Sequence, residues 1–182
     1  MTDQRRQAGG PQTDAEKTPD QAPDEMAAAG SALPDAISAV RPVHGFRRML
    51  GYRTTVWRDR YSEVELVIDD RHDNSHGIVH GGVYAALLDA SFGGAVAFCG
   101  VAGRTRLAVT IQLQTIYMAP ARRGVLKASG RVIAVEGRVA VCEGEVRLDD
   151  GTLCATGSAS FMYLHGSEQP DGVPAEMRKR KL

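Results

Sequence analysis

The sequence is poor in features that mark several protein classes. Aromatic residues make up only 5% of its 182 residues, which argues against the stacking surface that binds single-stranded nucleic acid. Lys plus Arg equals Asp plus Glu, so a formal net charge of zero attracts neither nucleic acid nor anionic membranes over long range. The composition therefore predicts no nucleic-acid partner and no membrane partner.

Cysteine is also scarce. The chain has three, Cys99, Cys142 and Cys154, and none of them forms a CxxC pair. This spacing argues against a disulfide framework and against a thiolate metal site, and it favours small buried thiols in a reducing compartment. We expect a cytoplasmic protein.

Long hydrophobic runs are nearly absent, and the N-terminus lacks the apolar core of a secretory signal. Only Val79–Phe98 is long enough to suggest a membrane span. Its apolar residues are largely Ala and Gly, and its central Asp89 would cost roughly 2.5–3.5 kcal/mol on membrane-insertion scales. We interpret the segment as a buried helix of a water-soluble protein.

Composition divides the chain into three parts. Residues 1–33 are rich in Gln, Pro, Asp, Ala and Gly, which predicts a disordered N-terminal tail. Residues 34–164 are expected to form one domain, which opens with a short helix that is interrupted by Pro42 and ends at Gly51. Residues 165–182 are expected to form a polar C-terminal tail.

Between the tails, the hydrophobic pattern changes from the alternation of strands to a helical period and back. Strands are predicted at residues 52–57, 61–69, 105–119, 124–135, 138–148 and 153–164, and a helix lies within residues 79–98. This order predicts an α+β fold, in which an antiparallel sheet curves around one central helix. The helix is apolar on nearly every side, so another surface must cover what the sheet does not.

Two of the predicted strands have a clear apolar face. Val64, Leu66 and Ile68 alternate along the second strand, and we expect them to point into the core. On the third strand, residues at alternating positions are expected to share one face; they are Leu107, Val109, Ile111 and Leu113.

Asp89 lies in the most apolar segment of the chain, and Gly81 and Gly82 open that segment. Backbone N–H groups at a helix start have no intrahelical partner, and glycines let a ligand oxygen approach them closely. A carbonyl group bound there would be polarised, and the oxyanion formed on attack would be stabilised. Asp89 could then act as the nucleophile or as the base that activates water, and both roles stay open.

The spacing of these groups predicts a dimer. Eight helical residues separate Gly81 from Asp89 by about 12 Å, which is too far for both to act on one carbonyl carbon. Two copies of the helix could bring Gly81 of one subunit near Asp89 of the other. A homodimer with shared sites would also cover the exposed helix face.

The residues before the helix, from Asn74 to Gly82, read "NSHGIVHGG", and Asp89 follows Gly82 by seven positions. This NxxGxxHGG pattern with its Asp, together with "YMAPARRG", "VEGRVAVCEGEV" and "DDGTLCATGSASFMYL", resembles the hotdog-fold acyl-CoA thioesterases of the PaaI-like (phenylacetate-pathway) type. The resemblance runs from about residue 43 to 164. It implies a hotdog fold, hydrolysis of an acyl-CoA to free acid and CoA without a cofactor, and assembly into dimers or tetramers.

The resemblance also implies roles for single residues. Gly81 would provide the polarising N–H group and Asp89 the catalytic carboxylate, while Asn74 would support the site and Thr110 would help to hold the hydrolytic water. Further residues are expected to contact the substrate at the helix start, in the acyl pocket or at the CoA phosphates; they are His80, Gly82, Tyr84, Leu88, Phe92, Arg122, Arg123 and Arg138.

Other interpretations compete with these. His72, His76 and His80 would align on a helix, but the turn-forming residues among them predict a loop, so we expect no metal site and a loop-fixing role for His80. Asp89 could instead be a structural carboxylate that pairs with Arg104 or Arg106. For the whole protein, the alternative is a non-catalytic acyl-CoA-binding or regulatory module, with a hotdog hydratase as a third hypothesis.

Overall fold

The computed structural model describes residues 45–179, so the predicted N-terminal tail and residues 34–44 of the first predicted helix lie outside the described residues. Helix α2 spans Gly45–Leu50. Gly51 follows it with φ of +86°, and its N–H donates to the carbonyl of Arg47 at 2.9 Å. A glycine in this left-handed conformation closes a helix, which confirms the predicted end.

The sheet contains every strand that the sequence predicts. Its strands are β1 (Arg53–Arg58), β2 (Tyr61–Val67), β4 (Ala108–Tyr117), β5 (Val125–Glu136), β6 (Val139–Leu148) and β7 (Leu153–Tyr163). They form a six-stranded sheet in the order β1-β2-β5-β6-β7-β4, and all neighbouring pairs are antiparallel.

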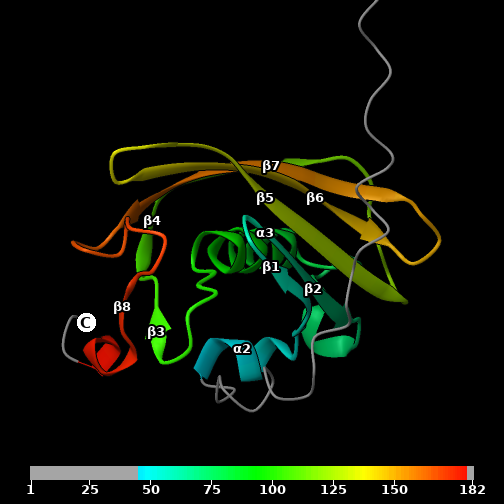
Figure 1. Ribbon diagram of the computed structural model, residues 1–182. Helices are drawn as coiled ribbons and strands as arrows, with labels where there is room; N and C mark the ends of the chain where they lie inside the picture. The colour runs from blue at the N-terminus through cyan, green and yellow to red at the C-terminus, as the bar shows by residue number, and fades with distance from the viewer. Residues whose placement is uncertain (1–44, 180–182) are drawn as a thin grey trace, which may run out of the picture. The chain divides into compact units, whose positions relative to one another are not determined.

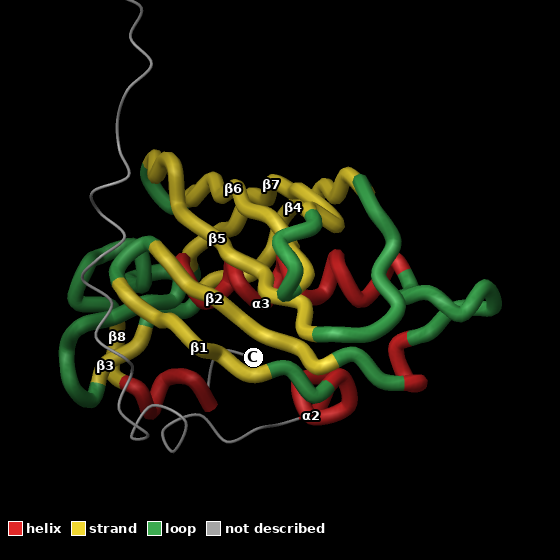
Figure 2. The backbone as a smooth tube through the Cα atoms, turned by 90° about the vertical axis from the view of Figure 1, so that its right-hand side faces the viewer, coloured by secondary structure: helices red, strands yellow, loops and turns green. Residues whose placement is uncertain are grey.

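Helix α3 (Gly81–Val96) lies against one face of this sheet. In Figure 1 strands β5, β6 and β7 arch over the helix, and Figure 2 shows the same layering from the side. The predicted inward face of β2 is confirmed, because Val64, Leu66 and Ile68 are at most 5% exposed. The fold is therefore the predicted curved antiparallel sheet around one main helix. No helix among residues 45–179 is both long and apolar enough to cross a bilayer.

A row of glycines lets α3 approach the sheet closely. Gly130, Gly144 and Gly157 are neighbours across β5, β6 and β7. A Cβ atom on Gly130 or Gly144 would lie 2.7–2.8 Å from the Phe92 ring, and one on Gly157 would lie 2.8 Å from Leu88. These contacts are too short for any side chain. The helix side chains thus occupy the space that the row leaves.

Strand β4 corrects one prediction. Leu107, Val109, Ile111 and Leu113 do not share a face, because the register of β4 against β7 shifts around Ile111. Such a bulge inserts an extra residue and reverses the alternation of side chains. Leu113, beyond the bulge, packs against the core, whereas Val109 before the bulge and Ile111 within it are 40% and 52% exposed.

Ordered structure continues beyond residue 164, where a polar tail was expected. Strand β8 (Val173–Pro174) pairs with β3 (Arg104–Thr105), and the short helix η2 (Ala175–Lys179) follows. The Arg104 guanidinium donates to the carbonyls of Asp171 and Gly172, both at 2.6 Å. Backbone pairing and these two bonds hold the segment against the domain.

Candidate active site

His80 caps the start of α3. Its Nδ1 accepts a hydrogen bond from the Gly82 N–H at 2.9 Å, and its carbonyl accepts one from the Val83 N–H. The loop-fixing role predicted for His80 is confirmed. An Nδ1 that accepts must carry no proton, so this arrangement requires the neutral imidazole with its proton on Nε2. Within residues 45–179, the Gly81 N–H at the helix tip has no acceptor.

Tyr117 lies beside this free N–H, and sequence reasoning missed it. The Cβ atom that Gly81 lacks would sit 3.3 Å from the Tyr117 ring and 3.4 Å from its hydroxyl oxygen. The ring meets Tyr84 edge to face, with centroids 6.2 Å apart, yet Tyr117 is 56% exposed. The "YMAP" stretch was the available signal, since it carries this tyrosine.

The loop before α3 is held by its own side chains. The Asn74 Oδ1 accepts the His76 N–H at 2.8 Å, so Asn74 shapes the loop that leads to the helix tip. His72 is buried, and its two ring nitrogens contact the Asp69 N–H and the Leu50 carbonyl. The part of the chain that the structure describes holds no cluster of three or more His, Cys, Asp or Glu arranged for a metal ion.

Asp89 lies eight residues after Gly81 on α3, and it is half-buried. Thr110 on β4 donates its hydroxyl to Asp89 Oδ1 at 2.8 Å, so the structure brings these two predicted residues together. Their neighbours on this helix face are small; they are Gly82, Ala85, Ala86, Ala90 and Gly93.

The alternative in which Asp89 pairs with an arginine is wrong. Arg104 binds the carbonyls of the C-terminal segment, and Arg106 donates to the carbonyls of Ser167 and Glu168 at 3.0 and 3.1 Å. Both guanidinium groups therefore stabilise the C-terminal segment, and Thr110 is the partner of the carboxylate.

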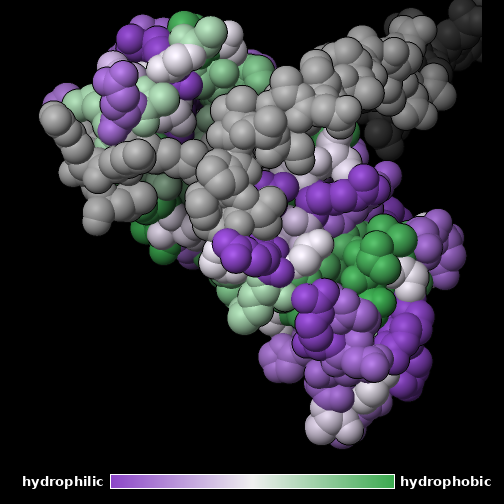
Figure 3. Space-filling model, turned by 90° about the horizontal axis from the view of Figure 1, so that it is seen from below, coloured by the Kyte–Doolittle hydropathy of each residue, from purple (hydrophilic) through white to green (hydrophobic). Residues whose placement is uncertain are grey.

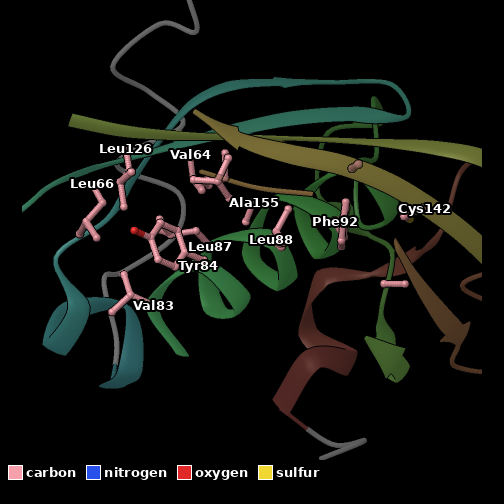
Figure 4. Close-up of a cluster of buried hydrophobic side chains, with 14 of the residues drawn as sticks. Val64, Leu66, Val83, Tyr84, Leu87, Leu88, Phe92, Leu126, Cys142 and Ala155 are labelled. Atoms are coloured by element: carbon pink, nitrogen blue, oxygen red, sulfur yellow. The ribbon is translucent and has the colours of Figure 1, made fainter. Parts of the chain in front are cut away.

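The residues expected in an acyl pocket lie in the core of the protomer. Leu88 and Phe92 have no exposed surface and Tyr84 has 3%. Figure 4 shows these three side chains rising from α3 toward the sheet. The Tyr84 hydroxyl accepts the Ala121 N–H at 3.0 Å, and burial raises the Tyr84 pKa. Within one protomer, these side chains therefore pack α3 against the sheet and do not line its exposed face.

Two of the three predicted phosphate-binding arginines lie at the loop before α3. Arg122 donates to the Gly77 carbonyl at 2.8 Å. Arg123 forms ion pairs with Asp70 at 2.8 Å and with Asp73 at 3.2 Å. The structure thus brings two cationic groups near the helix tip.

Arg138 lies at the opposite end of the helix. It occupies the turn between β5 and β6, and its carbonyl accepts the Tyr163 N–H at 2.8 Å. The Tyr163 hydroxyl in turn donates to the carbonyl of Val96, the last residue of α3. Arg138 is therefore not part of the group at the helix tip.

A hollow of about 590 Å³ lies on the other face of the sheet. Tyr61, Ser129 and Ser158 are among its lining residues, with the ion pair of Arg131 and Glu143. None of the predicted site residues lines it. The hollow is therefore separate from the predicted site around α3.

Comparison with known proteins agrees with this fold. The model of the thioesterase superfamily matches residues 76–155, which include α3 and two glycines of the row, Gly130 and Gly144. Among curated proteins, none matches the sequence.

Solved structures share the fold. A conserved protein from Pseudomonas aeruginosa is 27% identical, with a TM-score of 0.62, over 66% of this chain and 94% of that chain. A thioesterase from Haemophilus influenzae is 22% identical, with a TM-score of 0.59, over 65% and 81%. The PaaI protein from the phenylacetic acid degradation operon of E. coli is 19% identical, with a TM-score of 0.61, over 71% and 91%. The match to the thioesterase superfamily within a hotdog-type fold supports a thioester hydrolase.

Proposed function

We propose that this protein is a PaaI-like acyl-CoA thioesterase that works in the cytoplasm as a homodimer or a dimer of dimers, with each active site shared by two subunits. The observation that carries the proposal is the division of the catalytic groups into two half-sites. One half-site is the Asp89 carboxylate with the Thr110 hydroxyl. The other is the free N–H of Gly81 at the helix tip.

The separation of the half-sites supports sharing. Along α3, Gly81 and Asp89 are about 12 Å apart. Along β4, Thr110 contacts Asp89 and Tyr117 contacts Gly81, and seven extended residues span roughly 20 Å. No single thioester carbon can be reached by both groups of one protomer.

The edge of the sheet supports a partner of the same kind. β4 is an edge strand, and an exposed apolar edge is a template for pairing with another strand. Several large apolar residues on and beside it are exposed; they are Val109, Ile111, Ile116, Tyr117 and Met118. Figure 3, which views the side opposite the arching strands, also shows apolar surface next to strongly polar surface.

Antiparallel pairing of two β4 strands would join the half-sites. If Leu113 lies opposite Gln114 of a second copy, then Thr110 lies opposite Tyr117 of that copy. Asp89 of one subunit would then approach Gly81 of the other. The small residues on the exposed face of α3 would let the two helices or a ligand approach closely.

The chemistry follows from these groups. The thioester carbonyl oxygen would accept the Gly81 N–H, and the tetrahedral oxyanion would be stabilised there. With Asp89 as base, a water proton moves to the carboxylate, the water oxygen bonds to the carbonyl carbon, and the C–S bond breaks as the CoA thiolate takes up the proton. With Asp89 as nucleophile, its oxygen bonds to the carbonyl carbon and the C–S bond breaks, which gives an anhydride and the CoA thiolate. Water then hydrolyses the anhydride to the free acid and the Asp89 carboxylate, and the thiolate takes up the released proton. Thr110 orients the carboxylate in either case.

Arg122 and Arg123 support CoA as the carrier of the acyl group. Both are exposed and flank the loop at the helix tip, where the diphosphate of CoA could bind between them. Turnover of acyl-CoA compared with the same acyl group on an acyl carrier protein would test this choice.

Complementation tests the shared site. The Asp89→Ala and Gly81→Pro proteins should each lose activity on a panel of aromatic and aliphatic acyl-CoA substrates. Dissociation and mixing should restore up to about a quarter of the wild-type activity, because half of the dimers are mixed and one of their two sites is intact. No restoration in verified mixed dimers would contradict sharing, and acyl-CoA binding without turnover by the wild type would favour the non-catalytic binding module.

Single turnover in H₂¹⁸O separates the two roles of Asp89. If Asp89 is the nucleophile and water opens the anhydride at the Asp89 carbonyl, one unlabelled Asp89 oxygen passes to the first product and ¹⁸O stays in the Asp89 carboxylate. General-base attack by water would put ¹⁸O in the product at once. Mass spectrometry of the acid and of the peptide that contains Asp89 measures both.

A further inference from the structure

We infer that the Tyr117 hydroxyl is the second hydrogen-bond donor to the thioester oxygen, beside the Gly81 N–H. This inference rests on the proposed function and adds a catalytic residue to it. Its basis is the number of donors left at the helix tip and the position of Tyr117 over that tip.

The helix tip offers few donors to a ligand. The Gly82 N–H donates to His80 Nδ1, and the Val83 N–H donates to the His80 carbonyl. Of the first three N–H groups of α3, only that of Gly81 is free among the described residues. A developing oxyanion can accept more than one hydrogen bond, and the Gly81 N–H supplies only one of them.

Tyr117 is placed to provide it. Its hydroxyl oxygen lies 3.4 Å from the position that a Gly81 Cβ would take, so the hydroxyl is close to Gly81. The ring is held by its edge-to-face contact with Tyr84. Because Gly81 has no side chain, the Tyr117 ring and its hydroxyl lie directly against the glycine that carries the free N–H.

The hydroxyl of Tyr117 differs from those of other tyrosines. The Tyr61 hydroxyl donates to Glu63 Oε1, and the Tyr163 hydroxyl donates to the Val96 carbonyl. The Tyr84 hydroxyl accepts the Ala121 N–H. The Tyr117 hydroxyl makes none within residues 45–179, although the residue is 56% exposed and its ring is packed. An ordered phenol with an unused proton beside a free N–H is the arrangement that a carbonyl oxygen requires.

The donor role involves no proton transfer. The phenol hydroxyl only donates a hydrogen bond. Its hydrogen bond to the carbonyl oxygen strengthens as that oxygen gains negative charge, so the bond stabilises the transition state more than the bound substrate. Loss of the hydroxyl should therefore lower kcat and leave KM nearly unchanged.

The test compares Tyr117→Phe with Tyr61→Phe. Tyr117→Phe keeps the ring against Gly81 and Tyr84 and removes only the hydroxyl, and we expect kcat for acyl-CoA to fall by about 10²-fold. Tyr61→Phe removes a hydroxyl on the other face of the sheet and should retain the wild-type kcat. Equal kcat in wild type and Tyr117→Phe would overturn the inference.

Binding of two CoA analogues gives a second readout. A CoA thioether has no carbonyl oxygen, and it should bind wild type and Tyr117→Phe equally. A CoA trifluoromethyl ketone, which presents an oxyanion-like oxygen when hydrated, should bind Tyr117→Phe at least 10-fold more weakly. Equal weakening for both analogues would assign Tyr117 to packing and overturn its donor role. A wild type that hydrolyses no acyl-CoA would refute the proposed function. A fully active Tyr117→Phe variant would refute only the role of Tyr117.

Discussion

At the scale of single residues, His80 determines which backbone groups remain available at the helix tip. The two glycines suggest two free N–H groups, but the imidazole of His80 accepts the one from Gly82. Capping fixes the start of α3 and leaves the Gly81 N–H for a ligand. In the proposed site, the helix tip therefore offers one backbone donor. A substitution at Gly81 can remove it without the loss of a side chain.

Gly81→Pro should abolish activity without unfolding the helix. Proline is favoured at the first helical position, where it removes an N–H that has no helical partner. His80 already has φ of −62° and ψ of 136°, the extended conformation required before proline. We expect kcat to fall by about 10²–10³-fold and the thermal midpoint to stay near that of wild type.

Gly81→Ala is the matched control for this change. Alanine adds the same Cβ, at 3.3 Å from the Tyr117 ring, but keeps the N–H. Gly81→Ala should therefore retain much more activity than Gly81→Pro. Equal losses in the two variants would show that the contact with Tyr117, and not the N–H, is what the reaction needs.

Asp69 should make the loop before α3 sensitive to acid. Side-chain hydrogen bonds from Arg71 lower the Asp69 pKa from 3.8 to about 2. A carboxyl whose pKa is lowered on folding stabilises the protein above its ordinary pKa, and this contribution is lost as the pH falls toward 2. Asp69→Asn keeps an oxygen for the Arg71 N–H but does not titrate. Between pH 5 and 2, its free energy of unfolding should fall less than that of wild type, and equal slopes would contradict the assignment.

At the scale of elements, the glycine row explains how a helix with bulky apolar side chains lies so close to the sheet. Phe92 and Leu88 fill the space above Gly130, Gly144 and Gly157. The same contacts bury two residues that the sequence had suggested for substrate binding. The depth at which α3 sits on the sheet therefore sets the position of its exposed face and of Asp89.

Gly144→Ala should destabilise the domain. Its Cβ would lie 2.1 Å from the Ser129 carbonyl oxygen and 2.7 Å from the Phe92 ring, so strand and helix must both move. Overpacking of this kind costs about 1–3 kcal/mol, measurable by urea denaturation. Gly100→Ala is the control, because its Cβ would meet its nearest neighbour, Phe98, at 3.7 Å. A Gly144→Ala protein as stable as this control would contradict the account of the row.

At the scale of the whole molecule, the proposed dimer depends on the exposed edge of β4. Ile111→Lys places a charge at the bulge of this edge, where Ile111 is 52% exposed. We expect a monomer by analytical ultracentrifugation and a parallel loss of thioesterase activity, because lysine at a sheet edge opposes pairing. Val67→Lys adds the same charge at a residue of β2 that is 67% exposed, and it should remain dimeric. A dimeric, active Ile111→Lys protein would contradict pairing through β4.

The sequence by itself determined the elements and much of the chemistry. Periodicity depends on neighbours a few positions apart, so the strands, the start of α3 and the inward face of β2 could be predicted. Asp89 was identifiable because a carboxylate stands out in an apolar helix. Thr110 required the resemblance, since no local pattern joins it to a helix 21 positions away.

Only the tertiary structure decided what depends on contacts between distant segments. The bulge of β4, the burial of Leu88 and Phe92, and the strand pairing of the C-terminal segment all follow from packing partners that local periodicity does not specify. Tyr117 was missed for the same reason. Tyr117 lies beside Gly81 because β4 crosses the start of α3, which is 36 residues earlier in the chain. The sequence around an exposed edge tyrosine is the same whether or not a helix lies beside it.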